Sequence, residues 1–295
     1  MSPWARRLVG SFLFIAGAMC FASALGAQQP LSRLTPHRTG DFQAAFTQRS
    51  PESDPDRWAE RFQFEGRLDN WDYDLSEESF SLYVPPSYDP EGEPFGVVIW
   101  VSASDRGAIP DELRAVFDER RLIWIGPNNA GNARHLFQRT GLALDAAVNA
   151  REMYNVDPNR VFVSGLSGGG KVAALLAIDW SDVFSGAFPI IGMTTYLPVP
   201  LESNPGQSVF QFPAPASDLL DRARRQPFVI LTGSGDFNRE ECRLSAVAYA
   251  LDGFTDLHLV DVSGMGHEMP SAENFGRGLD LLLASTSTAS GTVGR

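Results

Sequence analysis

Three residues far apart in the sequence, Ser167, Asp236 and His267, have the types and the chain order of a nucleophile, an acid and a base. A serine hydroxyl is inert at neutral pH unless a base takes its proton, and a histidine oriented by a carboxylate can be that base. Each of the three follows an apolar run of the kind found in buried strands. We therefore expect the three side chains to converge at one edge of a sheet.

Ser167 lies in the stretch VSGLSGGGKV, which fits two motifs. The pattern G-x-x-x-x-G-K, ending at Lys171, binds phosphate, whereas G-x-S-x-G, ending at Gly169, is a strand-to-helix turn that presents a nucleophilic serine. A phosphate-binding loop needs Ser or Thr after its lysine to hold Mg²⁺, and this chain has Val172 there. The missing metal ligand favours the nucleophile.

The glycines of the G-x-S-x-G motif each have a physical reason. A serine at a sharp turn adopts strained backbone angles, and side chains at Gly165 and Gly169 would collide with the neighbouring strand and helix. Gly168 places a backbone N–H at the start of a helix, where it can stabilise a developing oxyanion.

The two proposed partners of Ser167 follow glycine-rich turns. Asp236 comes after the apolar run at 227–232, although an aspartate there could also cap the next helix. His267 comes after the run at 257–262, in the turn SGMGH. The remaining histidines are His37, His135 and His258. We interpret His37 and His258 as structural, whereas His135 could line the same cleft.

Apolar runs and amphipathic segments alternate along the chain from residue 79 onwards. The run GVVIWV is continuous, as in a strand buried on both faces, and such strands belong to parallel sheets. We expect strands at 80–84, 96–101, 122–125, 160–164, 186–191, 227–232 and 257–262. We expect helices at 113–119, 143–154, 170–178, 240–253 and 274–284. This alternation predicts an α/β fold with a doubly wound, mostly parallel sheet.

Three segments stand outside this pattern. Residues 28–78 are irregular beyond a possible strand at 61–64, and we interpret them as an N-terminal extension to a catalytic domain at 79–284. Residues 194–225 carry five prolines and several aromatics, which indicates a lid-like insertion or, equally, a packed surface loop. Residues 285–295 are small and polar, so we expect a disordered tail.

The first 27 residues have a basic start, a short apolar run and small residues after it, as in a secretory signal peptide. An uncleaved anchor is the alternative, but the run is shorter than the ~20 residues that span a bilayer. We therefore expect a secreted or periplasmic protein without stable membrane insertion. Cys242 is then the only remaining cysteine, which excludes an intramolecular disulfide. A net charge of −12 provides no basic surface for nucleic acid.

Four stretches carry a resemblance to a known family: DPNRVFVSGLSGGGKVAALLA, DVFSGAFPIIG, PFVILTGSGD and GMGHEMP. Together they resemble the α/β-hydrolase superfamily, particularly secreted esterases of the polyhydroxybutyrate-depolymerase and feruloyl-esterase type. The resemblance covers roughly residues 80–283 and implies the same roles for Ser167, Asp236 and His267. Where that family has His-Gly to supply a second oxyanion N–H, this chain has VSASD. We expect a main-chain N–H near Ser102 or Ala103 to serve instead.

Four further residues are candidates for binding substrate. Asn128 and Asn129 lie in the stretch IGPNNAGN, which indicates a shaped loop near the site or simply a turn. Tyr196 lies in the insertion. Lys171 follows Ser167 by one helical turn. It resembles a lysine of glucuronoyl esterases that faces sugar hydroxyls, but an ion pair with a nearby carboxylate is favoured.

These expectations combine into one function. The chain is predicted to cleave carboxylic esters, small or linked to a polymer, through an acyl-enzyme on Ser167, with no metal or cofactor. A serine peptidase of the same fold is the nearest alternative. A binding protein that kept the fold after losing its oxyanion hole is another, because a fold does not settle a function.

Overall fold

The computed structural model describes residue 35 and residues 37–289 of the 295-residue chain, and the side chains as far as residue 284. The predicted signal peptide at residues 1–27 lies outside the described residues, as do the last six residues of the predicted tail.

The described chain builds one sheet of eight strands in the order β1-β2-β4-β3-β5-β6-β7-β8. The strands are β1 (Gly40–Ala44), β2 (Phe80–Val84), β3 (Phe95–Val101), β4 (Leu122–Pro127), β5 (Val156–Leu166), β6 (Gly186–Ile190), β7 (Phe228–Gly233) and β8 (Leu257–Val262). β1 and β2 are antiparallel at one edge, and from β4 onwards each neighbouring pair is parallel. Parallel pairing brings the ends of β3, β5, β7 and β8 to the same edge.

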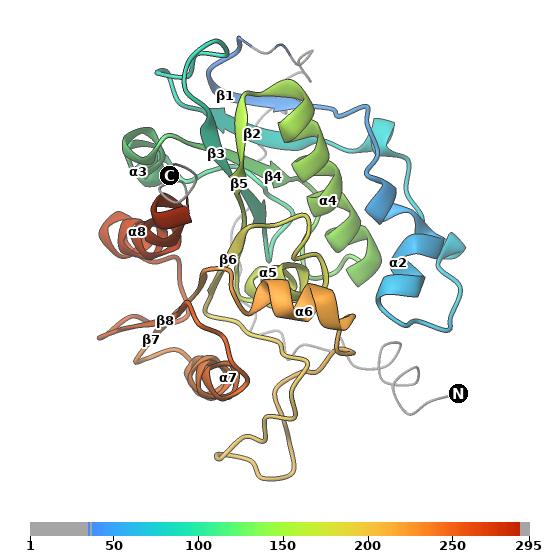
Figure 1. Cartoon of the computed structure of the whole chain (residues 1–295), viewed down its shortest axis with the longest axis vertical. Helices are drawn as coiled ribbons and strands as arrows, with labels where there is room; N and C mark the ends of the chain where they lie inside the picture. The colour runs from blue at the N-terminus through green and yellow to red at the C-terminus, as the bar shows by residue number, and fades with distance from the viewer. Residues whose placement is uncertain (1–34, 36, 290–295) are drawn as a thin grey trace, which may run out of the picture.

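Helices cover both faces of this sheet. They are α2 (Pro55–Arg61), α3 (Arg114–Arg120), α4 (Leu136–Met153), α5 (Gly168–Asp179), α6 (Ser217–Ala223), α7 (Arg239–Leu251) and α8 (Ala272–Ala289). Figure 1 shows α3 and α8 together on one side and α4 on the other. Successive residues of β3 alternate between the two cores, because strand side chains point to opposite faces. Ile99 packs in the core that includes α4 and α5, and Trp100 in the core that includes α3 and α8. The doubly wound, mostly parallel α/β fold is therefore confirmed.

The structure corrects several element boundaries. The possible strand at 61–64 is wrong: Arg61 ends α2, which Asp54 caps and Pro55 begins, and the chain turns after it. α4 begins at Leu136 rather than at residue 143, because nearly all of its faces are buried and no amphipathic pattern marks its first turns. β1 and α6 have no counterpart among the predicted elements. α8 continues to Ala289, into the segment predicted as a disordered tail.

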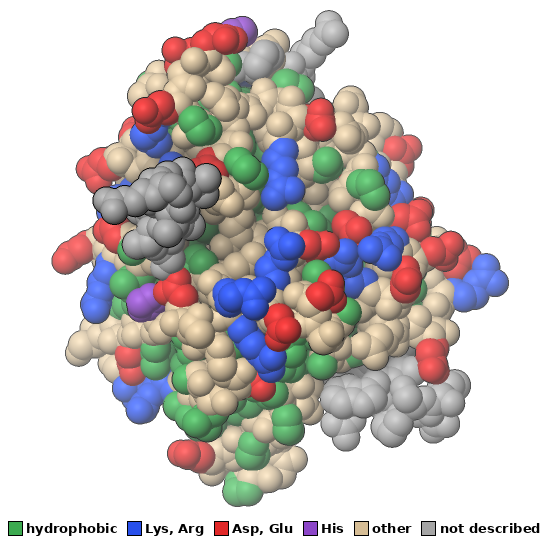
Figure 2. All heavy atoms as spheres, viewed as in Figure 1, with side chains coloured by type: hydrophobic (Ala, Val, Ile, Leu, Met, Phe, Trp, Pro, Cys, Tyr) green, Lys and Arg blue, Asp and Glu red, His purple; other side chains and the backbone are tan. Residues whose placement is uncertain are grey.

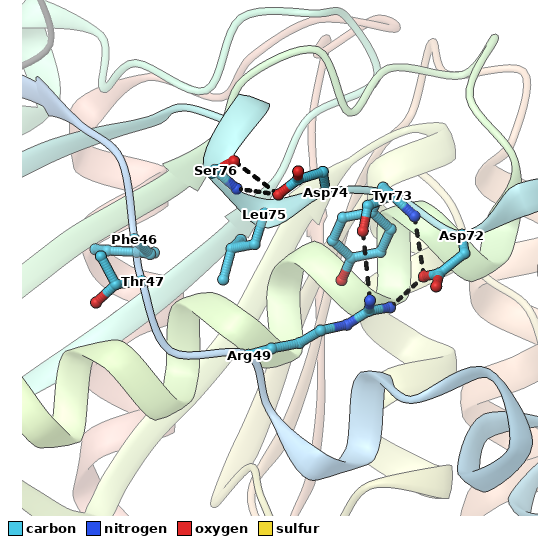
Figure 3. A pocket seen from close by; sticks show the side chains of 8 residues that line it. All are labelled: Phe46, Thr47, Arg49, Asp72, Tyr73, Asp74, Leu75 and Ser76. Atoms are coloured by element: carbon cyan, nitrogen blue, oxygen red, sulfur yellow. Dashed lines mark hydrogen bonds and ion pairs between the residues drawn. The ribbon is translucent and has the colours of Figure 1, made fainter.

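One buried carboxylate of α4 accepts three hydrogen bonds from the N-terminal extension. Asp145 accepts hydrogen bonds from the Ser50 N–H (2.7 Å), the Ser53 hydroxyl (2.7 Å) and the Tyr73 hydroxyl (2.6 Å). Burial raises the pKa of Asp145, and these donors oppose that rise. Figure 3 shows the open side of this contact, where Arg49 donates to the Tyr73 carbonyl and pairs with Asp72 in a surface pocket. None of the predicted site residues lines that pocket.

Replacing the carboxylate by Asp145→Ala should lower the free energy of unfolding by about 3 kcal/mol, because three donors lose a buried acceptor. Chemical denaturation measures the loss, and limited proteolysis should cut the extension faster. The matched control is Asp74→Ala, which removes an exposed cap from the same segment. Equal stability of the two variants would contradict this role for Asp145.

Charged side chains of opposite sign are mixed on the face in Figure 2, with basic groups near its centre and acidic groups among them. Ion pairs between described residues include Arg61 with Asp182 (2.7 Å) and Arg224 with Asp252 (2.8 Å). No helix in residues 37–289 is long and apolar enough to cross a membrane.

Candidate active site

Ser167 occupies the sharp turn between β5 and α5. Its backbone angles are φ 56° and ψ −117°, a conformation that L-residues seldom adopt and that surrounding packing must maintain. A methyl group on Gly165 would lie 2.5 Å from the Val101 carbonyl oxygen, and one on Gly169 would lie 1.9 Å from it. Both approaches are far inside van der Waals contact, so these glycines are required for β3 and α5 to pack around the turn.

The three predicted residues form one chain of hydrogen bonds at the carboxyl edge of the sheet. His267 Nε2 lies 2.8 Å from Ser167 Oγ, and His267 Nδ1 lies 2.7 Å from Asp236 Oδ1. Asp236 follows β7 and His267 follows β8, so parallel strands bring together side chains 31 and 100 residues apart. The arrangement allows the imidazole to take the serine proton while the carboxylate orients the ring.

The carboxylate of Asp236 is completely buried, whereas the His267 side chain remains about a quarter exposed. Its Oδ2 accepts from the Thr232 hydroxyl (3.1 Å), and its Oδ1 also accepts from the Asn238 N–H (3.1 Å). Asn238 in turn donates its side-chain amide to the Ile191 carbonyl (2.8 Å). These bonds help to fix the orientation of the carboxylate, and the sequence patterns had not indicated Thr232 or Asn238.

Phe237 covers the imidazole from the solvent side. Its ring stacks on His267 with a centroid separation of 4.0 Å and an interplanar angle of 23°, and the residue is 76% exposed. Single exposed apolar residues are common on protein surfaces, but this one lies on the histidine that is hydrogen-bonded to Ser167. Stacking limits rotation of the imidazole, and the outer face of the Phe237 ring stays open to a bound molecule.

The residues predicted to donate to an oxyanion lie at the start of α5 and in the loop after β3. A methyl group on Gly168 would lie 2.1 Å from Asn132 Oδ1, so the Asn132 amide packs directly against Gly168. The Asn132 N–H donates to the Ala103 carbonyl (3.0 Å). The Ser102 hydroxyl bonds within its own loop, to the Ser104 N–H (3.1 Å). These contacts bring together the predicted donors Gly168, Ser102 and Ala103, with Asn132 of the GPNNAGN loop between them.

Lys171 forms an ion pair with a carboxylate, which is the role that the sequence favoured for it. Its Nζ lies 3.0 Å from Glu241 Oε2, and Glu241 Oε1 accepts from the Met193 N–H (3.2 Å). Burial raises the pKa of Glu241, and the Lys171 ammonium opposes that rise. The pair ties α5 to α7 and to the chain that leaves β6.

The Asn128 side chain, one of the two asparagines predicted to bind substrate, makes contacts within the protein. The Asn128 amide accepts from the Gly107 N–H (3.0 Å) and the Ser81 hydroxyl (2.9 Å) and donates to Ser79 Oγ (3.1 Å). Its polar atoms therefore hold the loop after β4 against β2. Asn129 takes a left-handed φ of 53°, which asparagine tolerates in turns.

Tyr196 is not brought to Ser167. Its hydroxyl bonds to Asp252, just past the carboxyl end of α7, and its ring stacks on Tyr249 at 5.7 Å. Asp236 lies before the other end of α7, and thirteen residues of helix span about 20 Å. The insertion forms a two-stranded arm that projects from the body of the molecule in Figure 1. Its tip reaches the amino end of α7, where the Ser203 N–H donates to Glu240 (2.8 Å).

His135 and His258 have partners of their own. His135 caps α4 by accepting from the Phe137 N–H (3.3 Å), Trp71 stacks on it, and burial lowers the pKa of His135. His258 pairs with Asp256 (2.9 Å), and His37 is exposed. Cys242 is buried on α7. Within the described part of the chain, no three His, Cys, Asp or Glu side chains are grouped so as to hold a metal ion.

The chain has two short sequence matches to known enzymes, although no family model matches it. One is 44% identical over 54 residues to a polyhydroxybutyrate depolymerase of Talaromyces funiculosus, and the match covers 18% of this chain and 16% of that enzyme. The other is 43% identical over 44 residues to poly(3-hydroxyalkanoate) depolymerase C of Paucimonas lemoignei, covering 15% and 11%. The matches thus span about a sixth or less of these relatives.

Solved structures match over much more of the chain. Est1E from Butyrivibrio proteoclasticus superposes with a TM-score of 0.51 and 14% identity, over 73% of this chain and 97% of that one. An S-formylglutathione hydrolase of Staphylococcus aureus superposes with a TM-score of 0.50 and 14% identity, over 86% and 99%. Identities this low concern the fold alone. The sheet order, the helices on both faces and these superpositions establish that the chain has the α/β-hydrolase fold.

Proposed function

We propose that this protein is a serine hydrolase that cleaves carboxylic esters through an acyl-enzyme on Ser167. The observation that carries the proposal is the continuous hydrogen-bond chain from the buried Asp236 carboxylate through His267 to the Ser167 hydroxyl. The strained backbone of Ser167 supports it, because such strain persists where function requires it.

The proposed reaction has two steps. Ser167 Oγ attacks the ester carbonyl while His267 Nε2 takes its proton, and the Gly168 N–H stabilises the tetrahedral oxyanion. His267 then gives the proton to the departing alkoxide, and an acyl-enzyme remains. In the second step a water molecule attacks the acyl carbon and loses its proton to His267. His267 then gives that proton to Ser167 Oγ as the acyl–oxygen bond breaks, which releases the acid and restores the hydroxyl.

Esters are favoured over peptides by the local matches to two depolymerases, whose names concern polyesters. Their short length leaves the acyl group and the alcohol as proposals: a small ester or one linked to a polymer. Export through the signal peptide is part of the same proposal. The lid-like role of the insertion at 194–225 also remains a prediction.

Labelling with a fluorophosphonate probe, followed by a substrate panel, tests the proposal. We expect wild-type protein to be labelled on Ser167 and to hydrolyse p-nitrophenyl esters much faster than peptide p-nitroanilides. The panel should include short-chain, feruloyl, glucuronoyl and polyester substrates. Faster turnover of peptides would identify a peptidase, and protein that is neither labelled nor active would be a binding protein on a hydrolase fold.

Phe237→Leu should lower kcat/KM about threefold, because an aromatic pair contributes roughly 0.5–1.5 kcal/mol beyond its buried area. Leucine keeps apolar bulk but cannot stack on the imidazole. The matched control is Leu251→Ala, which alters a residue 85% exposed at the far end of α7. Unchanged kinetics of the Phe237 variant on several esters would show that the stack has no part in turnover.

A further inference from the structure

Arg139 is a buried cation that the proposed mechanism does not use. It lies in the first turns of α4, and only 2% of its surface is exposed. Within residues 37–284, no carboxylate lies in ion-pair contact with it, although charged side chains are seldom buried without a partner. Burial lowers the pKa of Arg139 to about 10, and the negative charge of Asp105 opposes that fall without an ion-pair contact, so the side chain is still cationic at neutral pH.

The guanidinium donates to two main-chain carbonyls that belong to different loops. Nη2 lies 2.9 Å from the Ser102 carbonyl oxygen, and Nε lies 2.9 Å from the Ala130 carbonyl oxygen. The first carbonyl follows β3, and the second precedes Asn132, whose amide packs on Gly168. Arg139 therefore joins the two loops that surround the start of α5.

The hydrogen bond from Arg139 to the Ser102 carbonyl fixes the orientation of the peptide group between Ser102 and Ala103. In a trans peptide the C=O and the N–H point in opposite directions, so the Ala103 N–H is directed away from α4. The Ala103 carbonyl is fixed separately by the Asn132 N–H. Among the described residues, the Ala103 N–H has no acceptor. The same loop packs on α5, because a methyl group on Gly169 would lie 3.1 Å from the Ser102 carbonyl carbon.

We propose that Arg139 is a positioning residue that holds the Ala103 N–H in place as the second oxyanion donor. The positive charge of Arg139 also stabilises the oxyanion, on the other side of the peptide group that joins Ser102 to Ala103. The inference rests on the proposed ester hydrolysis at Ser167. A preorganised donor stabilises the charge that develops in the transition state, and a cation fixed in a water-excluded site strengthens that effect. Arg139 itself touches neither the substrate nor Ser167.

Arg139→Met tests the inference by its effect on a transition-state analogue. Phenylboronic acid forms a tetrahedral anion on an activated serine and so occupies the oxyanion position. We expect kcat for p-nitrophenyl butyrate to fall about 100-fold, as when one oxyanion donor is lost. The inhibition constant of the boronic acid should rise by a similar factor, while KM changes little because the oxyanion is absent from the ground state.

Arg151→Met is the matched control, because Arg151 lies near the other end of α4 and also donates to a main-chain carbonyl, that of Val183 (2.6 Å). It should keep wild-type kcat and boronate affinity. If Arg139→Met does not fold, Arg139→Gln keeps one donor without the charge and should lose about tenfold in both quantities. A folded Arg139 variant with wild-type boronate affinity would overturn the inference. Wild-type protein that neither hydrolyses esters nor binds the boronic acid would reject the proposed function, and this inference with it.

Discussion

Ser167→Ala is expected to abolish ester turnover, with a loss of kcat of about 10⁶-fold, the size seen when a catalytic serine is removed from such a triad. The residual rate would come from water attacking an ester held beside the remaining oxyanion donors. Alanine has the same backbone restrictions as serine, so the strained turn and the melting temperature should stay close to those of wild type. Steady-state kinetics, thermal unfolding and fluorophosphonate labelling measure these three quantities.

Ser164→Ala is the matched control for this variant. Ser164 lies three residues earlier in β5, is fully buried and donates to the Phe188 carbonyl (2.6 Å). Its removal should cost about 1 kcal/mol of stability and leave turnover close to wild type. Ester turnover by Ser167→Ala within about tenfold of wild type would exclude an acyl-enzyme on this residue.

His267→Ala should lower kcat/KM by about 10⁴-fold to 10⁶-fold, because the Ser167 hydroxyl would then have no base to take its proton. The protein should remain folded, since the imidazole is partly exposed and its loss opens no cavity in the core. The remaining rate should increase with pH, as hydroxide replaces the missing base. A pH–rate profile beside circular dichroism distinguishes this result from unfolding.

The matched control is His258→Ala, because His258 also pairs with an aspartate, Asp256, and lies on β8, the strand that precedes His267. It should retain wild-type kinetics. Near-native activity of purified His267→Ala protein would reject His267 as the base, and a loss confined to His258→Ala would reassign that role.

Much of the α/β framework was predictable because its signals are local. The continuous apolar run of β3 and the alternation that follows it indicated a parallel sheet with helices on both faces, which the structure has. Prediction failed in the first turns of α4, because burial on nearly all faces leaves no amphipathic pattern there. It also failed for β1, which is a strand only because it pairs with β2 at the edge of the sheet. Residues 61–64 were predicted as a strand because apolar and polar residues alternate in them. So short an alternation is equally compatible with the end of a helix, which is what the structure has at Arg61.

The sequence by itself determined the serine, its flanking glycines and the order of its partners, because a sharp strand-to-helix turn and parallel strand ends impose those residue types wherever the fold occurs. Only the tertiary structure decided which side chains from other loops surround them. Phe237 over the imidazole, Asn132 against Gly168 and Arg139 on the Ser102 carbonyl are contacts between segments distant in the chain or set by the path of a loop. The position of Tyr196 beside Asp252 and Tyr249 was not predictable for the same reason, since the path of the insertion depends on packing and not on local pattern.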